Sequence, residues 1–297
     1  MDTTMGTATD AATTSATSAS SGVRFEYVDS ALEHIANGSE LPFWRHFHWG
    51  LFPDPEVDDP SPERYLRAAV AMTEHIVDAA GVRAGSRVLD VGCGFGGTLD
   101  LIRERHPGCR MVGINIDVRQ LLAGRRLLGF TGDAATHPFA FVTADGCRLP
   151  VADASMDHVL AVECIFHFPS RRDFLMEAGR VLKPGGTLAL SDFLMAPGAL
   201  HTIAARMGQE TLGDGNWYGH MARPLTPAGY RRLGRRAGLD LEIVDDVNRQ
   251  TLPTYRALAF LASATDEPGG VTTTGGLEEL SVSGALQYHV LAFRRRA

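Results

Sequence analysis

Apolar residues recur along this chain at two spacings, which predict strands and helices in alternation from residue 87 onward. Short apolar runs typical of buried strands occupy residues 87–91, 111–116, 139–142, 158–162 and 187–191. Helical patterns lie between them at 97–105, 118–128 and 171–182. A strand-helix-strand rhythm is typical of βαβ units, so we predict an α/β fold with a mostly parallel sheet and helices on both faces.

A cap of helices and aromatic residues is predicted before this core, over residues 23–82. Helical patterns cover 28–37 and 61–80, and the second begins with Ser61 and Pro62, a typical helix start. An aromatic cluster at 43–52 lies between them. Residues 1–22 are mainly Thr, Ala and Ser and lack the basic and apolar regions of a secretory signal, so we expect a disordered tail there.

The alternation lapses after residue 191 and resumes with a helix at 227–237. Strand patterns near 241–244 and 286–293 then close the chain. Residues 83–297 are therefore predicted to form one core. An insertion at 195–226, rich in glycine and carrying aromatic residues, is expected to form a lid over a site.

Composition and charge argue against several classes of protein. The chain is 297 residues long, 44% hydrophobic and 21% charged, and its net charge of −7 argues against a protein that coats nucleic acid. No stretch approaches the roughly 18–20 apolar residues that span a bilayer, so we expect no membrane partner. The four cysteines show no CxxC spacing, which favours reduced thiols in the cytoplasm over a disulfide framework, and we predict no metal ligands.

A glycine-rich loop joins the first predicted strand to the helix that follows. Gly92, Gly94 and Gly97 satisfy the pattern GxGxxG, which alone would suit a dinucleotide, or a tight turn without a ligand. Asp90, two positions before the first glycine, discriminates between ligands. A pyrophosphate gains nothing from a carboxylate there, whereas a ligand with an ammonium and a sulfonium group does, and S-adenosylmethionine is such a ligand.

From the aromatic cluster to the C-terminus, the chain resembles the class I S-adenosylmethionine-dependent methyltransferases. Four motifs occur in the family's order: the glycine loop, the end of the second strand at 113–117, Ala-Asp-Gly at 144–146 and Leu-Lys-Pro-Gly-Gly at 182–186. The resemblance implies a Rossmann-like fold. It also implies S-adenosylmethionine as cofactor and S-adenosylhomocysteine as its product.

The resemblance further implies which residues hold the cofactor. Asn115 and Gln120 would bind the ribose hydroxyls, with Asp117 in reserve, and Asp145 would accept a hydrogen bond from the adenine amine. The complete set expected to contact the cofactor is Asp90, Gly92, Gly94, Asn115, Ile116, Gln120, Asp145, Gly146, Cys147 and Val162.

Three ionisable residues follow the fourth and fifth predicted strands: Glu163, His167 and Asp192. The carboxyl ends of parallel strands face one crevice, so we expect these side chains to converge where the methyl group is transferred. A histidine titrates near neutrality and can take a hydroxyl proton, and a carboxylate can orient it. The pattern is similar to sugar O-methyltransferases of antibiotic biosynthesis, which implies His167 as the base and Asp192 as its partner. A packed histidine without proton transfer is the alternative.

Glu163 supports a second interpretation. In the prenyl-diphosphate C-methyltransferases a glutamate at this position acts as base after methyl addition to an alkene, and Thr251-Leu252-Pro253 is similar to a segment of that family. This alternative requires magnesium on the diphosphate of geranyl or farnesyl diphosphate, and the chain offers no convincing basic cluster for it. Glu163 could instead bind the cofactor's ammonium group. A protein of this fold could also bind the cofactor yet catalyse a cyclisation or only regulate.

Aromatic residues in two segments are the candidates for the acceptor site. His48-Trp49-Gly50-Leu51-Phe52 resembles the His-x-Gly-Tyr-Trp element of small-molecule methyltransferases, which implies acceptor contacts by His48, Trp49 and Phe52. Packing of these side chains in a hydrophobic core is the alternative. Trp217 and Tyr218 in the insertion are further candidates. The sequence thus predicts an enzyme that methylates a hydroxyl of a small, largely apolar secondary metabolite, and it leaves room for a homo-oligomer.

Overall fold

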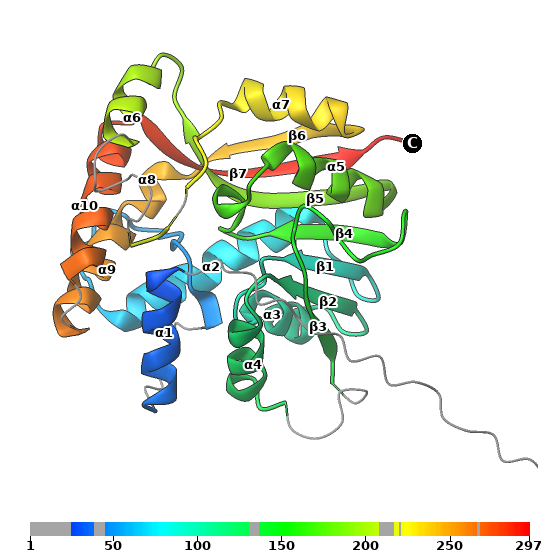
Figure 1. The fold of residues 1–297 in the computed structure, drawn as a ribbon, viewed down its shortest axis with the longest axis horizontal. Coiled ribbons are helices and arrows are strands. Elements are labelled where there is room, and N and C mark those ends of the chain that lie inside the picture. The colour runs from blue at the N-terminus through cyan, green and yellow to red at the C-terminus, as the bar shows by residue number, and fades with distance from the viewer. Residues whose placement is uncertain (1–24, 39–44, 131–136, 208–216, 220, 266–267) are drawn as a thin grey trace, which may run out of the picture.

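The computed structural model describes residues 25–38, 45–130, 137–207, 217–219, 221–265 and 268–297. The predicted tail, residues 1–22, lies outside these ranges, as do Phe43 and Trp44 of the aromatic cluster. Figure 1 shows a twisted sheet with helices on both faces and a group of helices gathered at one end.

A seven-stranded sheet forms the centre of the molecule, in the order β3-β2-β1-β4-β5-β7-β6. The strands are β1 Arg87–Val91, β2 Arg110–Asn115, β3 Phe139–Thr143, β4 Met156–Ala161, β5 Leu182–Met195, β6 Leu239–Asp246 and β7 Leu286–Arg295. Strands β1 to β5 pair in parallel, whereas β7 runs antiparallel to both β5 and β6. The predicted α/β, Rossmann-like fold with a mostly parallel sheet is confirmed.

Helices cover both faces of this sheet because its strands are apolar on both sides. Consecutive residues of a strand point to opposite faces, and Val88 packs with α2 Pro62–Ala80 and α3 Gly97–Arg105, while Leu89 packs with α5 Arg171–Val181 and α7 Pro227–Arg236. Helix α2 begins at the predicted N-cap residue, Ser61, whose Oγ accepts a hydrogen bond from the backbone N–H of Arg64.

The remaining elements lie mostly at the carboxyl end of the sheet. They are α1 Glu26–Ala36, α4 Val118–Leu127, the short 3₁₀ helix η3 Ile165–His167, α6 Leu200–Met207, α8 Asn248–Thr251, α9 Pro253–Thr265 and α10 Pro268–Val282. A third buried cluster joins α1, α2, α4 and α9 through Ala31, Tyr65, Ala123 and Ala257. The cap is thereby tied to the core.

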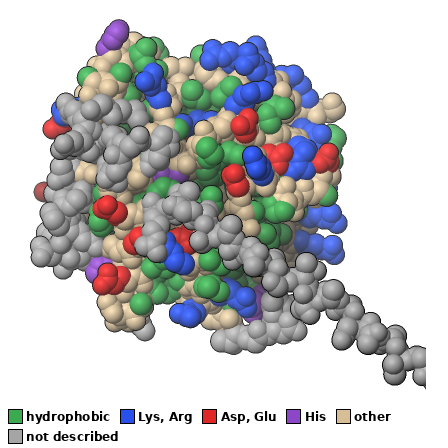
Figure 2. Space-filling view, viewed as in Figure 1, with side chains coloured by type: hydrophobic (Ala, Val, Ile, Leu, Met, Phe, Trp, Pro, Cys, Tyr) green, Lys and Arg blue, Asp and Glu red, His purple; other side chains and the backbone are tan. Residues whose placement is uncertain are grey.

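Arginine side chains gather on one edge of the molecule. Helix α7 exposes Arg231, Arg232, Arg235 and Arg236, and the blue group at the top of Figure 2 lies over this helix. The nearby Arg294 and Arg296 are paired with Glu242 and Asp240 on β6.

Several elements differ from the sequence prediction. The fifth strand is expected to end at residue 191, but β5 continues to Met195 because β7 pairs with it along this stretch, with Asp192 opposite His289. Helices α9 and α10 are not among the predicted elements. For α10 the reason is that the segment 268–276 is rich in glycine and threonine, which have low helix propensity.

The longer β5 places Asp192 in a buried ion pair. Its Oδ2 accepts hydrogen bonds from Arg171 Nε at 2.8 Å and from the Tyr230 hydroxyl, and its Oδ1 accepts from Arg171 Nη2 at 3.1 Å and from the Phe193 backbone N–H at 2.9 Å. Both members of the pair are buried, since Asp192 is 0% exposed and Arg171 is 6% exposed. The pair therefore ties α5 and α7 to β5.

Replacement of Arg171 by methionine is expected to lower the free energy of unfolding by about 3–5 kcal/mol, because it leaves the Asp192 carboxylate buried without its cation. Chemical denaturation of the full chain measures the change. Arg249→Met removes an exposed pair with Glu56 and serves as the matched control, with a much smaller change expected. Equal stability of the two variants would contradict the assignment.

Candidate functional site

A cavity of about 560 Å³ opens at the carboxyl ends of β1, β2 and β4. The glycine loop forms its floor. Gly92 and Gly94 have φ values of +74° and +52°, which favour glycine, and a Cβ on Gly92 would lie 2.6 Å from Cys164 Sγ. The sequence therefore needs glycine here both for the backbone conformation and for the close approach of β4.

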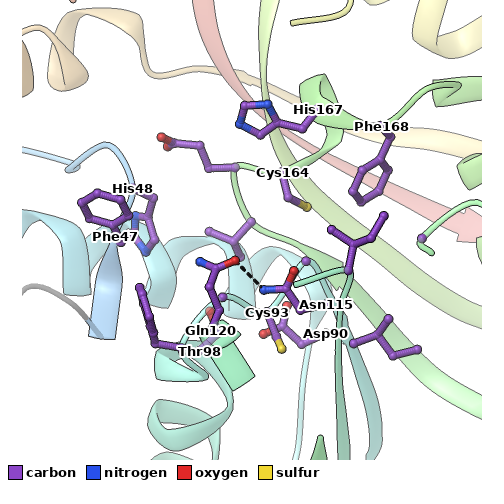
Figure 3. Close-up of a pocket in the computed structure, with 18 of the residues that line it drawn as sticks. Phe47, His48, Asp90, Cys93, Thr98, Asn115, Gln120, Cys164, His167 and Phe168 are labelled. Carbon is purple, nitrogen blue, oxygen red and sulfur yellow. Dashed lines mark hydrogen bonds between the residues drawn. The ribbon is translucent and has the colours of Figure 1, made fainter. Parts of the chain in front are cut away.

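The predicted cofactor residues are brought together around this floor. All of them except Cys147 line the cavity, and Figure 3 shows Asp90, Asn115 and Gln120 side by side. Asn115 Nδ2 donates to Gln120 Oε1 at 2.9 Å, which orders the expected ribose pair. Cys147 instead directs its thiol to the carbonyl of Ser170, away from the cavity lining.

The reserve candidate for the ribose, Asp117, is bound elsewhere. Its carboxylate accepts hydrogen bonds from Arg119, with Nη2 at 2.6 Å, and from the Arg119 backbone N–H at the start of α4. Arg119 also contacts Asp29 of α1 at 2.7 Å. These bonds engage Asp117 in fixing the cap to α4, and Asp117 does not line the cavity.

Asp90 is a buried carboxyl group in the floor of the cavity. It is 1% exposed, and neither carboxylate oxygen has a hydrogen-bond partner among the described residues. Burial raises the pKa of Asp90 to about 7. A buried carboxylate that the protein itself does not pair is suited to a cationic ligand, so the residues present fit the ammonium and sulfonium of S-adenosylmethionine.

Glu163 stands at the end of β4 in a left-handed backbone conformation, with φ of +48°. Its Oε2 accepts hydrogen bonds from the Trp49 backbone N–H at 2.7 Å and from the Tyr288 hydroxyl at 2.5 Å. Burial raises the pKa of Glu163 to about 8, although both donors oppose this shift. A strained backbone and a perturbed carboxyl at a cavity wall are typical of a functional residue.

His167 lies in η3 and also lines the cavity. Phe25 packs on its ring at a centroid distance of 4.6 Å, and the Tyr27 hydroxyl lies 3.3 Å from its Nε2. Both aromatic residues come from the start of α1, and both line the cavity. The helical pattern in the sequence begins at residue 28, whereas α1 begins at Glu26, so Phe25 and Tyr27 are not among the predicted site residues.

The predicted pairing of His167 with Asp192 requires correction. Asp192 lies within β5, and its two oxygens accept the four hydrogen bonds from Arg171, Tyr230 and Phe193 described above. It does not line the cavity. Asp192 is therefore reassigned to the buried ion pair.

The aromatic candidates divide between the cavity and the core. His48 lines the cavity, whereas Trp49 and Phe52 are buried in hydrophobic clusters beside it. Trp49 still contributes its backbone N–H to Glu163. The packing alternative therefore describes the side chains of Trp49 and Phe52.

His48 is held as a neutral imidazole. Its Nδ1 lies 3.0 Å from the Trp49 carbonyl, and its Nε2 lies 2.9 Å from Thr73 Oγ1. Burial lowers the pKa of His48 to about 4, and that of His46, which also contacts Thr73 Oγ1, to about 3. These histidines orient the chain that leads to Trp49.

The two candidates of the insertion, Trp217 and Tyr218, contact Tyr27 and do not themselves line the cavity. The Tyr218 ring is 5.6 Å from that of Tyr27, and its hydroxyl bonds Thr274 Oγ1 at 2.8 Å. The Trp217 carbonyl accepts a weak hydrogen bond from the Tyr27 backbone N–H at 3.4 Å. Residues 208–216 and 220 of the predicted lid lie outside the described residues, so the lid remains a prediction.

The described ranges contain neither a metal-binding cluster nor a membrane-spanning helix. No cluster of three or more His, Cys, Asp or Glu side chains with the arrangement of a metal site occurs there. None of the described helices is both long and apolar enough to cross a bilayer.

Comparison with known proteins identifies the family. Residues 89–190 match the family model of the methyltransferase domain. The chain is 35% identical over 235 residues to the methyltransferase GfsG of Streptomyces halstedii, which covers 78% of each chain. It is 31% identical to 27-O-demethylrifamycin SV methyltransferase of Amycolatopsis mediterranei, over 65% of this chain and 68% of that protein.

Solved structures with the same fold include enzymes of different activity. Geranyl diphosphate C-methyltransferase from Streptomyces coelicolor superposes with a TM-score of 0.69 at 20% identity, over 91% of this chain and 97% of that chain. The [4+2]-cyclase SpnF superposes with a TM-score of 0.69 at 19% identity, over 91% and 94% of the two chains. At this identity the likeness concerns the fold alone. With the family match and the GfsG relationship, the chain belongs to the class I S-adenosylmethionine-dependent small-molecule methyltransferases.

Proposed function

We propose that this enzyme transfers the methyl group of S-adenosylmethionine to a hydroxyl of a small, largely apolar secondary metabolite. The observation that carries the proposal is one cavity in which the glycine loop faces His167 and Glu163 across aromatic walls. Two relatives support oxygen as the target by their names, the rifamycin enzyme above and O-methyltransferase resE of Aspergillus sclerotiorum, which is 35% identical over 142 residues.

The cofactor, when bound, supplies an activated methyl group on a positively charged sulfur. We propose that Asp90 and the glycine loop hold its charged end, that Asn115 and Gln120 hold the ribose, and that Asp145 holds the adenine. In support, nine of the ten predicted residues line the cavity, and Asp90 is a buried carboxyl without a protein partner among the described residues.

We propose His167 as the base that accepts the hydroxyl proton, now without Asp192 as its partner. His167 reaches the cavity from η3, and the ring contacts of Phe25 and Tyr27 fix its orientation. Methyl transfer needs alignment and a proton acceptor more than it needs a better leaving group, so a positioned imidazole suffices.

Methylation of an alkene carbon is the second candidate, and the half-buried Glu163, with its left-handed backbone and raised pKa, is the observation that favours it. In that reaction the Glu163 carboxylate would take the proton after methyl addition. The prenyl-diphosphate version has less support. Arg45 is the one Lys or Arg side chain among the described lining residues, and it pairs with Asp100, whereas a diphosphate needs several basic contacts.

We also propose a cytoplasmic protein that acts on a free small molecule. The four cysteines occur as free thiols in the structure, as suits a reducing compartment, and the net charge of −7 disfavours nucleic acid as a partner. Assembly into a homo-oligomer stays a prediction.

Replacement of Asp90 by asparagine is expected to weaken S-adenosylhomocysteine binding about 10- to 100-fold, because it removes a charge-assisted contact with the ligand's ammonium group. In the wild type, the proton on Asp90 must leave before the cation binds, so affinity should rise with pH and level off above a pH of about 7. In Asp90→Asn this pH dependence should vanish. Calorimetry between pH 6 and 8 measures both effects.

The control for this measurement is Asp157→Asn, which changes a carboxylate at the opposite end of β4 that is paired with Lys183. Its affinity should match the wild type. Binding of S-adenosylhomocysteine that is the same in Asp90→Asn and wild type at every pH would remove Asp90 from the cofactor site.

A labelling assay with S-adenosylmethionine separates oxygen from carbon as the target. One set of acceptors holds a glycosylated macrolactone and a phenolic polyketide, and the other holds geranyl and farnesyl diphosphate, each with and without magnesium. We expect label in the hydroxyl set, independent of magnesium. Label confined to the diphosphate set with magnesium would establish the alternative, and cofactor binding without any label would favour a non-methylating role.

With an acceptor in hand, His167→Ala is expected to lower turnover by about two orders of magnitude or more and to leave S-adenosylhomocysteine affinity nearly unchanged. Glu163→Gln keeps an oxygen that can accept from Trp49 and Tyr288, so it should lower turnover far less. A larger loss of turnover in Glu163→Gln than in His167→Ala would make Glu163 the base.

A further inference from the structure

The first turn of α1 places a phenol beside the imidazole of His167 in the lining of the cavity. Tyr27 lines the cavity, and its hydroxyl lies 3.3 Å from His167 Nε2. The two rings are nearly parallel, at an angle of 18° and a centroid distance of 5.9 Å. An acceptor hydroxyl that comes near this nitrogen therefore also comes near the Tyr27 oxygen.

The surrounding contacts hold this phenol in place. The Tyr27 ring stacks on Phe47 at 5.6 Å and packs against Tyr218 at 5.6 Å. Helix α1 itself is fixed to α4 by the ion pair of Asp29 with Arg119. Tyr27 is thus a positioned group and not a loose part of the wall.

The chemistry of the two groups sets the direction of their hydrogen bond. The unprotonated nitrogen of a neutral imidazole is a good acceptor, and a phenol is a good donor. The Tyr27 hydroxyl therefore donates to His167 Nε2, while the lone pairs of its oxygen remain available to a ligand. Burial and the neighbouring Glu163 raise the pKa of Tyr27 well above its usual value, so it stays a neutral phenol and cannot act as the base alone.

We propose that Tyr27 is a further catalytic residue, which relays the proton of the acceptor hydroxyl to His167. This inference rests on the proposed O-methylation. As the acceptor oxygen bonds to the methyl group, the carbon–sulfur bond breaks and its electron pair stays on sulfur. The acceptor's proton passes to Tyr27 Oη, and the Tyr27 proton passes to His167 Nε2. The products are the methyl ether, S-adenosylhomocysteine and an imidazolium, which returns its proton to water.

The direction of the hydrogen bond can be tested without an acceptor. Nitrogen-15 NMR of histidine-labelled full chain, saturated with S-adenosylhomocysteine at a pH where His167 is neutral, reports which imidazole nitrogen carries hydrogen. The His167 signals are assigned by their loss in His167→Gln. We expect Nε2 without hydrogen, and a shift of its signal in Tyr27→Phe. A hydrogen on Nε2, or a signal that Tyr27→Phe leaves unchanged, would overturn the proposal.

The control for the spectrum is Tyr255→Phe, which removes another buried hydroxyl, one that bonds Ser281 Oγ at 2.7 Å. It should leave the His167 signals in place. If Tyr255→Phe shifts them as much as Tyr27→Phe does, the shift reports general repacking and the proposal fails.

Turnover tests the relay itself. The acceptor is the compound that is labelled in the assay above, either the glycosylated macrolactone or the phenolic polyketide. Tyr27→Phe keeps the ring and should lower kcat about 10- to 100-fold, with the acceptor KM changed less than about threefold. In a His167→Ala background the same change should cost less than about twofold, because a relay without its final acceptor has nothing more to lose.

These outcomes separate the inference from the proposed function. A kcat for Tyr27→Phe within about threefold of the wild type, or an equal loss in the His167→Ala background, would overturn the relay and leave O-methylation standing. Full activity of His167→Ala would instead contradict the role of His167 as base, and the proposed relay would fail with it. Tyr255→Phe should keep the wild-type kcat.

Discussion

The half-buried carboxyl group of Glu163 joins three parts of the chain that lie far apart in sequence. Its Oε2 accepts hydrogen bonds from Trp49 in the cap and from Tyr288 in β7, at the end of β4 where the backbone is left-handed. A carboxyl group removed from water costs several kcal/mol unless donors compensate for the loss. The cap and the last strand therefore have to meet at this point. The walls of the cavity stand where they do because Glu163 fixes the cap and β7 relative to the glycine loop.

The half of the site that faces the cofactor could be predicted from the sequence because its determinants are local. Asp90 and Gly92 sit at the end of one strand, and Asn115 at the end of the next, so the parallel sheet alone brings them to one edge. Gln120 lies in the first turn of α4, and the hydrogen bond between Gln120 and Asn115 needs no distant segment. Each side chain is placed by the element that carries its motif.

The acceptor half could not be predicted in the same way, because it depends on pairings between distant segments. Asp192 was expected at the end of a strand, but nine consecutive pairs with β7 extend β5 past it and turn its carboxylate toward Arg171. Tyr288 and Tyr27 occupy opposite ends of the described chain and carry no motif. Only tertiary packing brings their hydroxyls to Glu163 and His167. A cyclase and a C-methyltransferase share this fold, so the fold by itself does not determine a reaction.

The charges of the cavity also constrain its ligands. Asp90 is a buried carboxyl and Glu163 a half-buried one, with pKa values raised to about 7 and about 8, and the lining arginine, Arg45, is already paired with Asp100. A cation in the cavity lowers the cost of ionising either carboxyl, whereas an anion raises it. With S-adenosylmethionine bound as proposed, methyl transfer would turn its sulfonium into a neutral thioether and remove one positive charge from the cavity. On this proposal the two carboxyls favour S-adenosylmethionine over S-adenosylhomocysteine and disfavour an anion such as a diphosphate.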